Sequence, residues 1–384
     1  MTPEAAPPPG MTVTQIVPLF PPRIDGIGDY GLLLAAHLRD GYGMESRFLI
    51  GDPAWRPGAA AGFPARAVSG RGAGALERDL ADAGPVMLHY VGYGYQKRGV
   101  PLWLVDGLRR WKLAEPSRRL VVIFHELWSS GPPWRSEFYL RPAQRHLASR
   151  LLRLSDASLT STPTMVRLLD AIVPGRTAFH PVPSNLPAVD PAARRLNRGG
   201  PVRVVIFGQE GTRLRSVQSH GALLAGLVRE DLLAGVDVVG GGARGGATPS
   251  ADVRRLFSWV PADLVHVSSD VPAAEASRIL AQADLFLTFY PPALVCKSGT
   301  VTAALACGCV PVLPGASDRS ALAEGCEVLA CDGSPLAVAR VVRTIRDGSI
   351  ARLAEAGWRW QAANASWESL SRRVSGILVG LPPP

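Results

Sequence analysis

The chain has few cysteines and few lysines, and both shortages exclude classes of protein. All five cysteines lie in the C-terminal half, and no two of them form a Cys-x-x-Cys pair. This argues against a disulfide framework or a structural zinc site and indicates buried thiols in a reducing compartment. Only three of the 41 basic residues are lysines, and the arginines are scattered. The sequence has no zinc finger, RNA-binding signature or basic arm, so nucleic acid is not an expected partner.

Long hydrophobic runs are also missing. No apolar stretch approaches the roughly 20 residues that a membrane-spanning helix needs. The opening MTPEAAPPPG has the composition of a disordered tail and not of a signal peptide. We therefore expect a cytoplasmic protein, either free or peripheral at the inner membrane face. A net charge of +9 favours anionic partners, such as nucleotide phosphates or an anionic membrane face.

What is present is a regular alternation of apolar runs and amphipathic segments. One series runs from VTQIVPLF (13–20) to TAFHPV (177–182), and a second from VRVVIFG (202–208) to EVLA (327–330). Strands alternating with helices predict an α/β protein with parallel sheets, here in two Rossmann-like domains of similar size. The expected parts are a disordered tail (1–10), an N-terminal domain (11–185), a Pro-, Asn- and Gly-rich linker (186–200), a C-terminal domain (201–363) and a terminal helix (364–384). One possible arrangement of the terminal helix is to pack back on the N-terminal domain.

The segment LFLTFYPPALVCKSGTVTAALACGCVPVL (285–313) reads as strand, loop, helix and strand. The first N–H groups of a helix lack partners within it, so such a turn can hold an anion. Gly299 permits close approach of the backbone, and Ser298 and Thr300 add hydroxyl donors. Lys297 adds a positive charge. An ordinary capped helix with a surface lysine explains the pattern equally well.

Two arginines follow the first strand of the C-terminal domain. Arg213 and Arg215 come just after VVIFGQEG, and a bidentate guanidinium suits a diphosphate. The spacing does not choose between them. The later stretch VVGGGARGG (238–246) is similar to a dinucleotide fingerprint, but no helix is expected to start there and no acidic residue ends a following strand. We interpret it as a flexible loop.

The first strand–helix turn of the N-terminal domain is rich in glycine. Gly26, Ile27 and Gly28 allow the backbone to approach a ligand, and Asp29 and Tyr30 lie in the first helical turn. We consider Asp29 an acceptor-binding carboxylate or a catalytic base. The alternative is that Asp29 only caps the helix.

Histidines end two later strands of the same domain. His125 and Glu126 follow the apolar run LVVIF, and ligands of open α/β sheets bind at the carboxyl ends of the strands. Either side chain could take a proton from an acceptor hydroxyl. His89 ends the preceding strand, with Tyr93 shortly after it. Both could line an acceptor cleft, but packing explains them as well.

Several segments resemble nucleotide-sugar glycosyltransferases of the GT-B class, in particular bacterial group-1, polysaccharide-type members. The resemblance spans nearly the whole chain and is carried by PPRIDGIGDYGLLLAAHL, HYVGYGYQKRGVPLWL, VIFHELWSSGPPWR, VVIFGQEGTRLRSVQSHGALLAGL, LACGCVPVL and NASWESLSRRVSGIL. It implies two Rossmann-like domains facing each other across a cleft, with a nucleoside-diphosphate sugar on the C-terminal domain. The acceptor, a glycan, lipid-linked sugar or small molecule, would bind the N-terminal domain. The paired glutamates of many retaining members are missing, since their positions match about Val295 and Ala303.

The expected activity is metal-independent transfer of a sugar to a hydroxyl acceptor without a cofactor, because the candidate phosphate-binding groups are cations and backbone N–H donors. Two alternatives remain. The missing glutamates favour a degenerate member that binds a nucleotide sugar or scaffolds an assembly. A nicotinamide-dependent oxidoreductase is also compatible with two α/β domains, but the dinucleotide fingerprint is absent.

Overall fold

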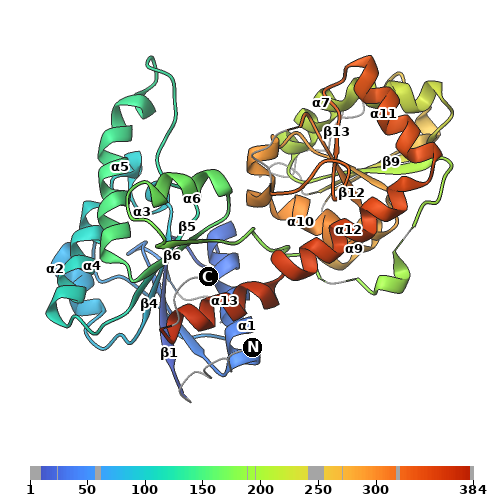
Figure 1. The fold of residues 1–384 in the computed structure, drawn as a ribbon. Helices are drawn as coiled ribbons and strands as arrows, with labels where there is room; N and C mark the ends of the chain where they lie inside the picture. The colour runs from blue at the N-terminus through green and yellow to red at the C-terminus, as the bar shows by residue number, and fades with distance from the viewer. Residues whose placement is uncertain are drawn as a thin grey trace. The chain divides into compact units, whose positions relative to one another are not determined.

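The computed structural model describes residues 10–23, 25–56, 62–187, 189–194, 196–240, 255–269, 271–316 and 321–380. Nearly all of the expected tail (1–10) and the 241–246 part of the glycine-rich loop lie outside these ranges. The chain divides into two compact units (Figure 1). Unit 1 contains the residues up to His180 and those from Trp367 onward, and unit 2 runs from Pro181 to Ser366.

Unit 1 is built on a seven-stranded sheet with the order β3-β2-β1-β4-β5-β6-β7, and every pair in it is parallel. The expected strands are present with ends shifted by a few residues. Pro18 ends the first strand early, because proline cannot donate to the ladder. The strands are β1 (Thr12–Val17), β2 (Glu45–Ile50), β3 (Ala65–Ala67), β4 (Val86–Tyr90), β5 (Leu120–Phe124), β6 (Ala157–Thr160) and β7 (Thr177–Phe179).

Helices cover both faces of this sheet because alternate strand residues point to opposite sides. Val13, Met87 and Val121 face one side, where they pack with residues of α1 and α13. Ile16 and Leu88 face the other side, where α2, α4 and α5 pack. Figure 1 shows α13 beside α1, although they lie at opposite ends of the sequence. The helices are α1 (Gly26–Tyr42), α2 (Ala73–Asp79), α3 (Gly92–Tyr95), α4 (Leu102–Ala114), α5 (Ser136–Leu154), α6 (Pro163–Asp170) and α13 (Trp367–Leu378), with the short 3-10 turn η1 (Lys97–Gly99).

Unit 2 has a six-stranded parallel sheet with the order β10-β9-β8-β11-β12-β13. The expected linker 186–200 is bonded into this unit: Ser277 Oγ donates to the Pro187 carbonyl oxygen at 2.9 Å. The strands are β8 (Val202–Phe207), β9 (Leu233–Gly240), β10 (Val265–Ser269), β11 (Leu285–Leu287), β12 (Val310–Leu313) and β13 (Leu329–Ala330). The helices are α7 (Glu210–Arg229), α9 (Ala273–Ala281), α10 (Gly299–Ala306), α11 (Pro335–Arg346) and α12 (Ser349–Asn364), with the 3-10 turns η2 (Pro191–Ala193), η3 (Ala262–Leu264) and η4 (Pro292–Lys297).

Each sheet has one point at which the strand order reverses. In unit 1 it lies between β1 and β4, and in unit 2 between β8 and β11. The connections that leave these two strands run to opposite sides, which opens a crevice at their carboxyl ends where α/β proteins bind ligands. The segments that follow β1, β4, β8 and β11 are therefore the candidate ligand-binding segments.

No helix within the described ranges is long and apolar enough to cross a membrane.

Candidate functional site

The turn after β1 is closed by a cap that the sequence analysis missed. Asp25 is the N-cap of α1, since the Gly28 N–H donates to Asp25 Oδ2 at 3.0 Å. Asp29 therefore does not supply the N-cap, although its charge in the first turn still complements the helix dipole. Asp29 lies in the first turn, half-buried, and desolvation followed by the nearby Asp25 charge raises the pKa of its carboxyl group. Its role as a base or acceptor ligand stays a prediction.

The two glycines of this turn differ in what surrounds them. A Cβ on Gly28 would lie 2.6 Å from the Leu19 carbonyl oxygen, whereas a Cβ on Gly26 would meet nothing within 4 Å. Gly28 is thus needed for packing of α1 against the end of the β1 segment. Only Gly26 has the open space that a close ligand would require, and Ile27 beside it is half-buried.

We expect Gly28→Ala to lower the thermal stability of the protein and Gly26→Ala to leave it nearly unchanged. The added methyl group of the first variant clashes with backbone, and overpacking of this kind costs about 1–3 kcal/mol. Thermal unfolding of both variants beside the wild type measures the difference. Equal melting temperatures for the two variants would contradict the assignment.

The carboxyl ends of β1, β4 and β5 bring a chain of polar side chains together. His89 Nδ1 lies 3.1 Å from His125 Nε2, and His89 Nε2 lies 2.9 Å from Gln15 Oε1. Gln15 Nε2 donates to Ser46 Oγ at 3.0 Å. His89 and Gln15 are fully buried, whereas His125 is partly exposed. The structure therefore joins two histidines that the sequence analysis had considered separately.

This chain fixes the tautomers of both imidazoles. Because Gln15 presents its oxygen, His89 must donate through Nε2–H. Burial, followed by the neighbouring His125, holds the pKa of His89 well below its usual value, so His89 is neutral and its Nδ1 is an acceptor. His125 then donates through Nε2–H, and in the neutral ring the lone pair lies on His125 Nδ1. His125 is thereby arranged to accept a proton through Nδ1.

Tyr30 holds the histidine pair from the side of α1. Its ring meets His125 edge-on with centroids 4.9 Å apart and His89 at 5.8 Å. Trp367 of α13 packs on the other side of Tyr30 at 5.1 Å, and His37 stacks on Trp367 at 6.0 Å. Tyr30 thus positions the imidazole rings.

The remaining unit 1 candidates lie nearer the surface. Glu126 and Tyr93 are exposed, so both are accessible to a ligand. The Glu126 N–H points toward the Tyr90 carbonyl oxygen at 3.5 Å.

Tyr95, which was not among the candidates, holds the ends of β1 and β4 together. Its hydroxyl lies 3.0 Å from the Ile16 carbonyl oxygen and 2.9 Å from the His89 carbonyl oxygen.

Stability should fall in mild acid because buried histidines are held neutral. Burial lowers the pKa of His89 in unit 1 and of His220 in unit 2. In the unfolded chain both take up a proton near pH 6.5, so unfolding binds protons below that pH. The free energy of unfolding is therefore highest above about pH 6.5. Below that pH it decreases by up to about 1.4 kcal/mol per pH unit for each of the two histidines.

Melting curves recorded at about pH 7.5 and about pH 5.5 measure this loss. His89→Gln should reduce the difference in melting temperature between the two pH values for unit 1 alone. His220→Gln should reduce that difference for unit 2 alone. An unchanged pH dependence in both variants would show that other groups are responsible.

In unit 2 the structure separates the two candidate arginines. Arg213 is fully buried and donates through Nη1 to the Gly240 carbonyl oxygen at 3.2 Å, which ties α7 to the end of β9. Arg215 is exposed, and its guanidinium lies 3.9 Å from the centroid of the Phe289 ring. Phe289 follows β11, and its N–H donates to Ser216 Oγ at 3.1 Å. Of the two, Arg215 is accessible to a ligand at the switch point.

The turn after β11 has the form expected of an anion site. Lys297 ends η4, and Ser298 precedes the first turn of α10. Within the described part of the chain, no side chain caps that turn: Ser298 Oγ pairs with Thr300 Oγ1 at 2.8 Å. A Cβ on Gly299 would make an ordinary van der Waals contact with the Pro183 carbonyl oxygen at 3.7 Å, so the 182–183 segment lies beside this turn. These features allow an anion at the helix N-terminus.

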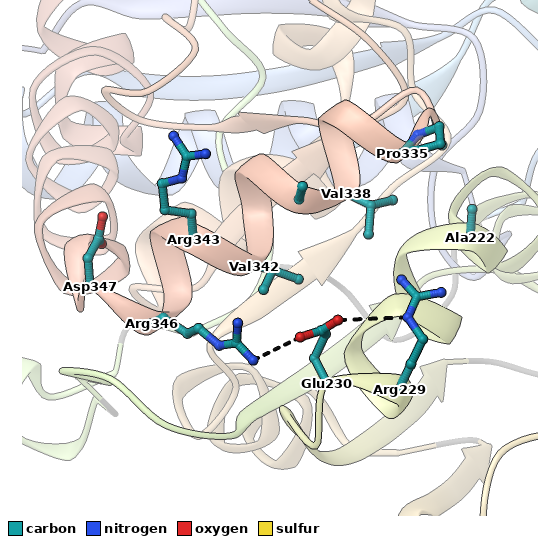
Figure 2. A pocket seen from close by; sticks show the side chains of 11 residues that line it. Ala222, Arg229, Glu230, Pro335, Val338, Val342, Arg343, Arg346 and Asp347 are labelled. Atoms are coloured by element: carbon teal, nitrogen blue, oxygen red, sulfur yellow. Dashed lines mark hydrogen bonds and ion pairs between the residues drawn. The ribbon is translucent and has the colours of Figure 1, made fainter.

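A groove of about 650 Å³ runs between α7 and α11 (Figure 2). Its charged part is occupied by ion pairs of Glu230, at 3.7 Å from Arg229 and 2.8 Å from Arg346. These residues end α7 and α11, whereas the switch point lies where α7 begins. The groove is therefore not part of the β8/β11 crevice.

Among the described residues, no group of three or more His, Cys, Asp or Glu side chains is placed to hold a metal ion. Metal independence stays a prediction.

Neither a protein-family model nor a curated protein matches the sequence. Solved structures do match its fold over nearly the full length. A glycosyltransferase from Rickettsia africae is 11% identical with a TM-score of 0.65, covering 97% of this chain and 99% of its own. An E. coli structure described as trehalose-6-phosphate bound with UDP-2-fluoro glucose is 10% identical with a TM-score of 0.61, covering 97% and 100%. A Listeria monocytogenes protein assigned as a UDP-N-acetylglucosamine 2-epimerase is 12% identical with a TM-score of 0.56, covering 97% and 98%.

These likenesses agree with the two parallel sheets, and the expected fold class is confirmed: the chain has the GT-B fold, with two Rossmann-like domains.

Proposed function

We propose that the protein is a glycosyltransferase that moves a sugar from a nucleoside-diphosphate donor to a hydroxyl group of a glycan, a lipid-linked sugar or a small molecule. The observation that carries this proposal is the switch point of unit 2. There the exposed Arg215 guanidinium of α7 stacks on Phe289, which follows β11. After Phe289 the chain passes through η4, which ends at Lys297, into the first turn of α10, which has no side-chain cap. Cations and helix N–H groups at one crevice suit a diphosphate.

The same groups would assist the chemistry. When the sugar leaves, negative charge grows on the diphosphate. Arg215, Lys297 and the first N–H groups of α10 stabilise that charge without having to reorganise. They need neither a cofactor nor a divalent metal, so activity should survive EDTA, and a loss in EDTA that Mn²⁺ restores would overturn this part of the proposal.

Unit 1 would bind and activate the acceptor. His125 Nδ1 takes the proton of the acceptor hydroxyl, while His89 and Gln15 hold the ring in the tautomer that makes this nitrogen the base. Asp29 and Glu126 are the alternative bases. Gly26 and Tyr93 lie where an acceptor would pass, since both are exposed beside the β1 and β4 ends.

A panel of nucleoside diphosphates and their sugars in a thermal-shift screen, followed by product analysis, tests the proposal. A ligand that binds only the folded state raises the melting temperature. A transferase shows a shift with a matching nucleotide and releases the diphosphate when an acceptor is present. Binding without turnover would favour a scaffold. An isomerised nucleotide sugar would favour an epimerase, since the fold is shared with a protein of that assignment. A shift with nicotinamide dinucleotides alone would favour an oxidoreductase.

We place the protein in the cytoplasm, with the inner face of the membrane as a site of peripheral contact.

A further inference from the structure

The N-terminal half of α5 is a helix face that the fold of unit 1 leaves uncovered. From Phe138 to Ala143 no residue of α5 is buried, whereas Gln144 is buried, and Leu147, Ala148, Leu151 and Leu152 belong to the core of unit 1. Figure 1 shows this end of α5 and the loop before it projecting from the body of unit 1. Large aromatic side chains are exposed here: Trp134 by 82%, Tyr139 by 72% and Phe138 by 39%.

The aromatic side chains are interleaved with arginines. Arg135, Arg141 and Arg145 are all exposed. Helical spacing places Phe138, Arg141 and Arg145 on one stripe of α5. We call the exposed set Trp134, Arg135, Phe138, Tyr139, Arg141 and Arg145 the α5 face.

A buried side chain holds further basic residues beside this face. Gln144 is 2% exposed, and it accepts from the Ser129 N–H at 2.8 Å and donates to the Arg98 carbonyl oxygen at 2.9 Å. It thereby joins η1, which carries the exposed Lys97 and Arg98, to α5 and to the loop that leads into α5.

We propose that the α5 face docks on the surface of a bilayer containing anionic lipids. The sequence segments 97–99 and 126–145 contain five basic residues, three of them on the α5 face and two in η1. The acidic residues in the same two segments are Glu126 and Glu137. Anionic headgroups complement that excess of positive charge. Tryptophan and tyrosine favour the headgroup level of a membrane, where the ring is partly desolvated and its polar edge stays wet. The helix lies in the interface plane and does not span the bilayer.

A membrane fits this surface better than a protein partner does. Protein interfaces are also enriched in arginine and aromatic residues, so the choice between the two partners rests on charge and not on composition. The basic residues around the exposed aromatic side chains complement anionic headgroups, and a bilayer needs no matching rigid surface. The inference goes beyond the proposed glycosyl transfer and does not depend on it.

Co-sedimentation of the full chain with phosphatidylcholine vesicles, with and without phosphatidylglycerol, tests the proposal. We expect binding only to the vesicles with phosphatidylglycerol, and we expect added salt to weaken it, because headgroup attraction is screened. Trp134→Ser combined with Tyr139→Ser should lower the partition coefficient by about tenfold or more. Arg141→Gln should lower it by about fivefold, as for the loss of one charge near the surface.

Matched controls lie in unit 2. Leu336→Ser changes an apolar side chain that is 80% exposed, and Arg352→Gln removes an exposed charge, so neither should alter vesicle binding. Far-ultraviolet circular dichroism shows that each variant is folded. Three results would overturn the proposal: no binding by the wild type, equal binding to both vesicle types, or equal losses in the controls. A wild-type oligomer that the Trp134/Tyr139 variant dissolves, with no vesicle binding, would identify a protein interface instead.

Discussion

Replacing His125 by alanine is expected to lower the rate of sugar transfer by about a hundredfold or more and to leave the affinity for the donor nearly intact. The reason is that the acceptor hydroxyl loses its base, while the proposed donor groups belong to the other unit. Steady-state turnover with the identified donor and acceptor, together with donor affinity from titration calorimetry, measures the two effects separately.

Three further variants show whether His125 acts as the base itself. His89→Asn breaks the bond that fixes the His125 tautomer, so it should lower turnover less than His125→Ala and change the pH–rate profile. Asp29→Asn and Glu126→Gln should retain most activity. Near-wild-type turnover of His125→Ala would exclude it as the base. A hundredfold loss in Asp29→Asn instead would transfer the role to that carboxylate.

The second large effect is expected on donor binding. Arg215→Ala and Lys297→Ala should each weaken the binding of a nucleoside diphosphate by about tenfold to a hundredfold, because a charge-assisted hydrogen bond is worth about 1.5–3 kcal/mol. Little core is touched in either case, since Arg215 is exposed and Lys297 is partly exposed. Titration calorimetry of the folded variants gives the affinities.

Two controls accompany these variants. Lys97→Ala removes an exposed lysine of unit 1 and should not alter nucleotide affinity. Arg213→Ala should instead reduce stability, because that side chain is fully buried and bonded to the Gly240 carbonyl oxygen. An unchanged affinity in both Arg215→Ala and Lys297→Ala would remove the β8/β11 crevice from the proposed donor site.

The repeating strand and helix patterns were enough to predict two parallel sheets, but some elements carried no signal. β3 is only three residues long, Ala65–Ala67, which is too short for its Ala-Arg-Ala alternation to be recognised as a strand, and it pairs with β2 at the edge of the sheet. β11 is shorter than its apolar run predicted. The chain leaves the sheet at Thr288, whose hydroxyl accepts from the Tyr290 N–H at 3.3 Å, and two prolines follow.

The choice between Arg213 and Arg215 shows a limit of sequence spacing. Residues two apart on a helix point to nearly opposite sides, so burial of one implies exposure of the other. The sequence does not say which side faces β9. The contact between His89 and His125 could not be predicted from the sequence for a related reason. His89 and His125 lie on adjacent strands, but only the packing in three dimensions places His89 Nδ1 against His125 Nε2.

Capping was missed because two acidic residues compete in one turn. Asp25 and Asp29 both lie near the start of the helix, and the sequence indicates only that Asp29 belongs to its first turn. The helix begins at Gly26, so Asp25 is the cap.

Hydrogen exchange with and without a nucleoside diphosphate locates the bound nucleotide without requiring the acceptor. We expect slower exchange at the start of α7 (Glu210–Arg229) and across η4 and the first turn of α10 (Gly299–Ala306), with the β1–α1 turn of unit 1 unchanged. Protection confined to that unit 1 turn, with none at α10, would contradict a nucleotide-sugar donor site on unit 2.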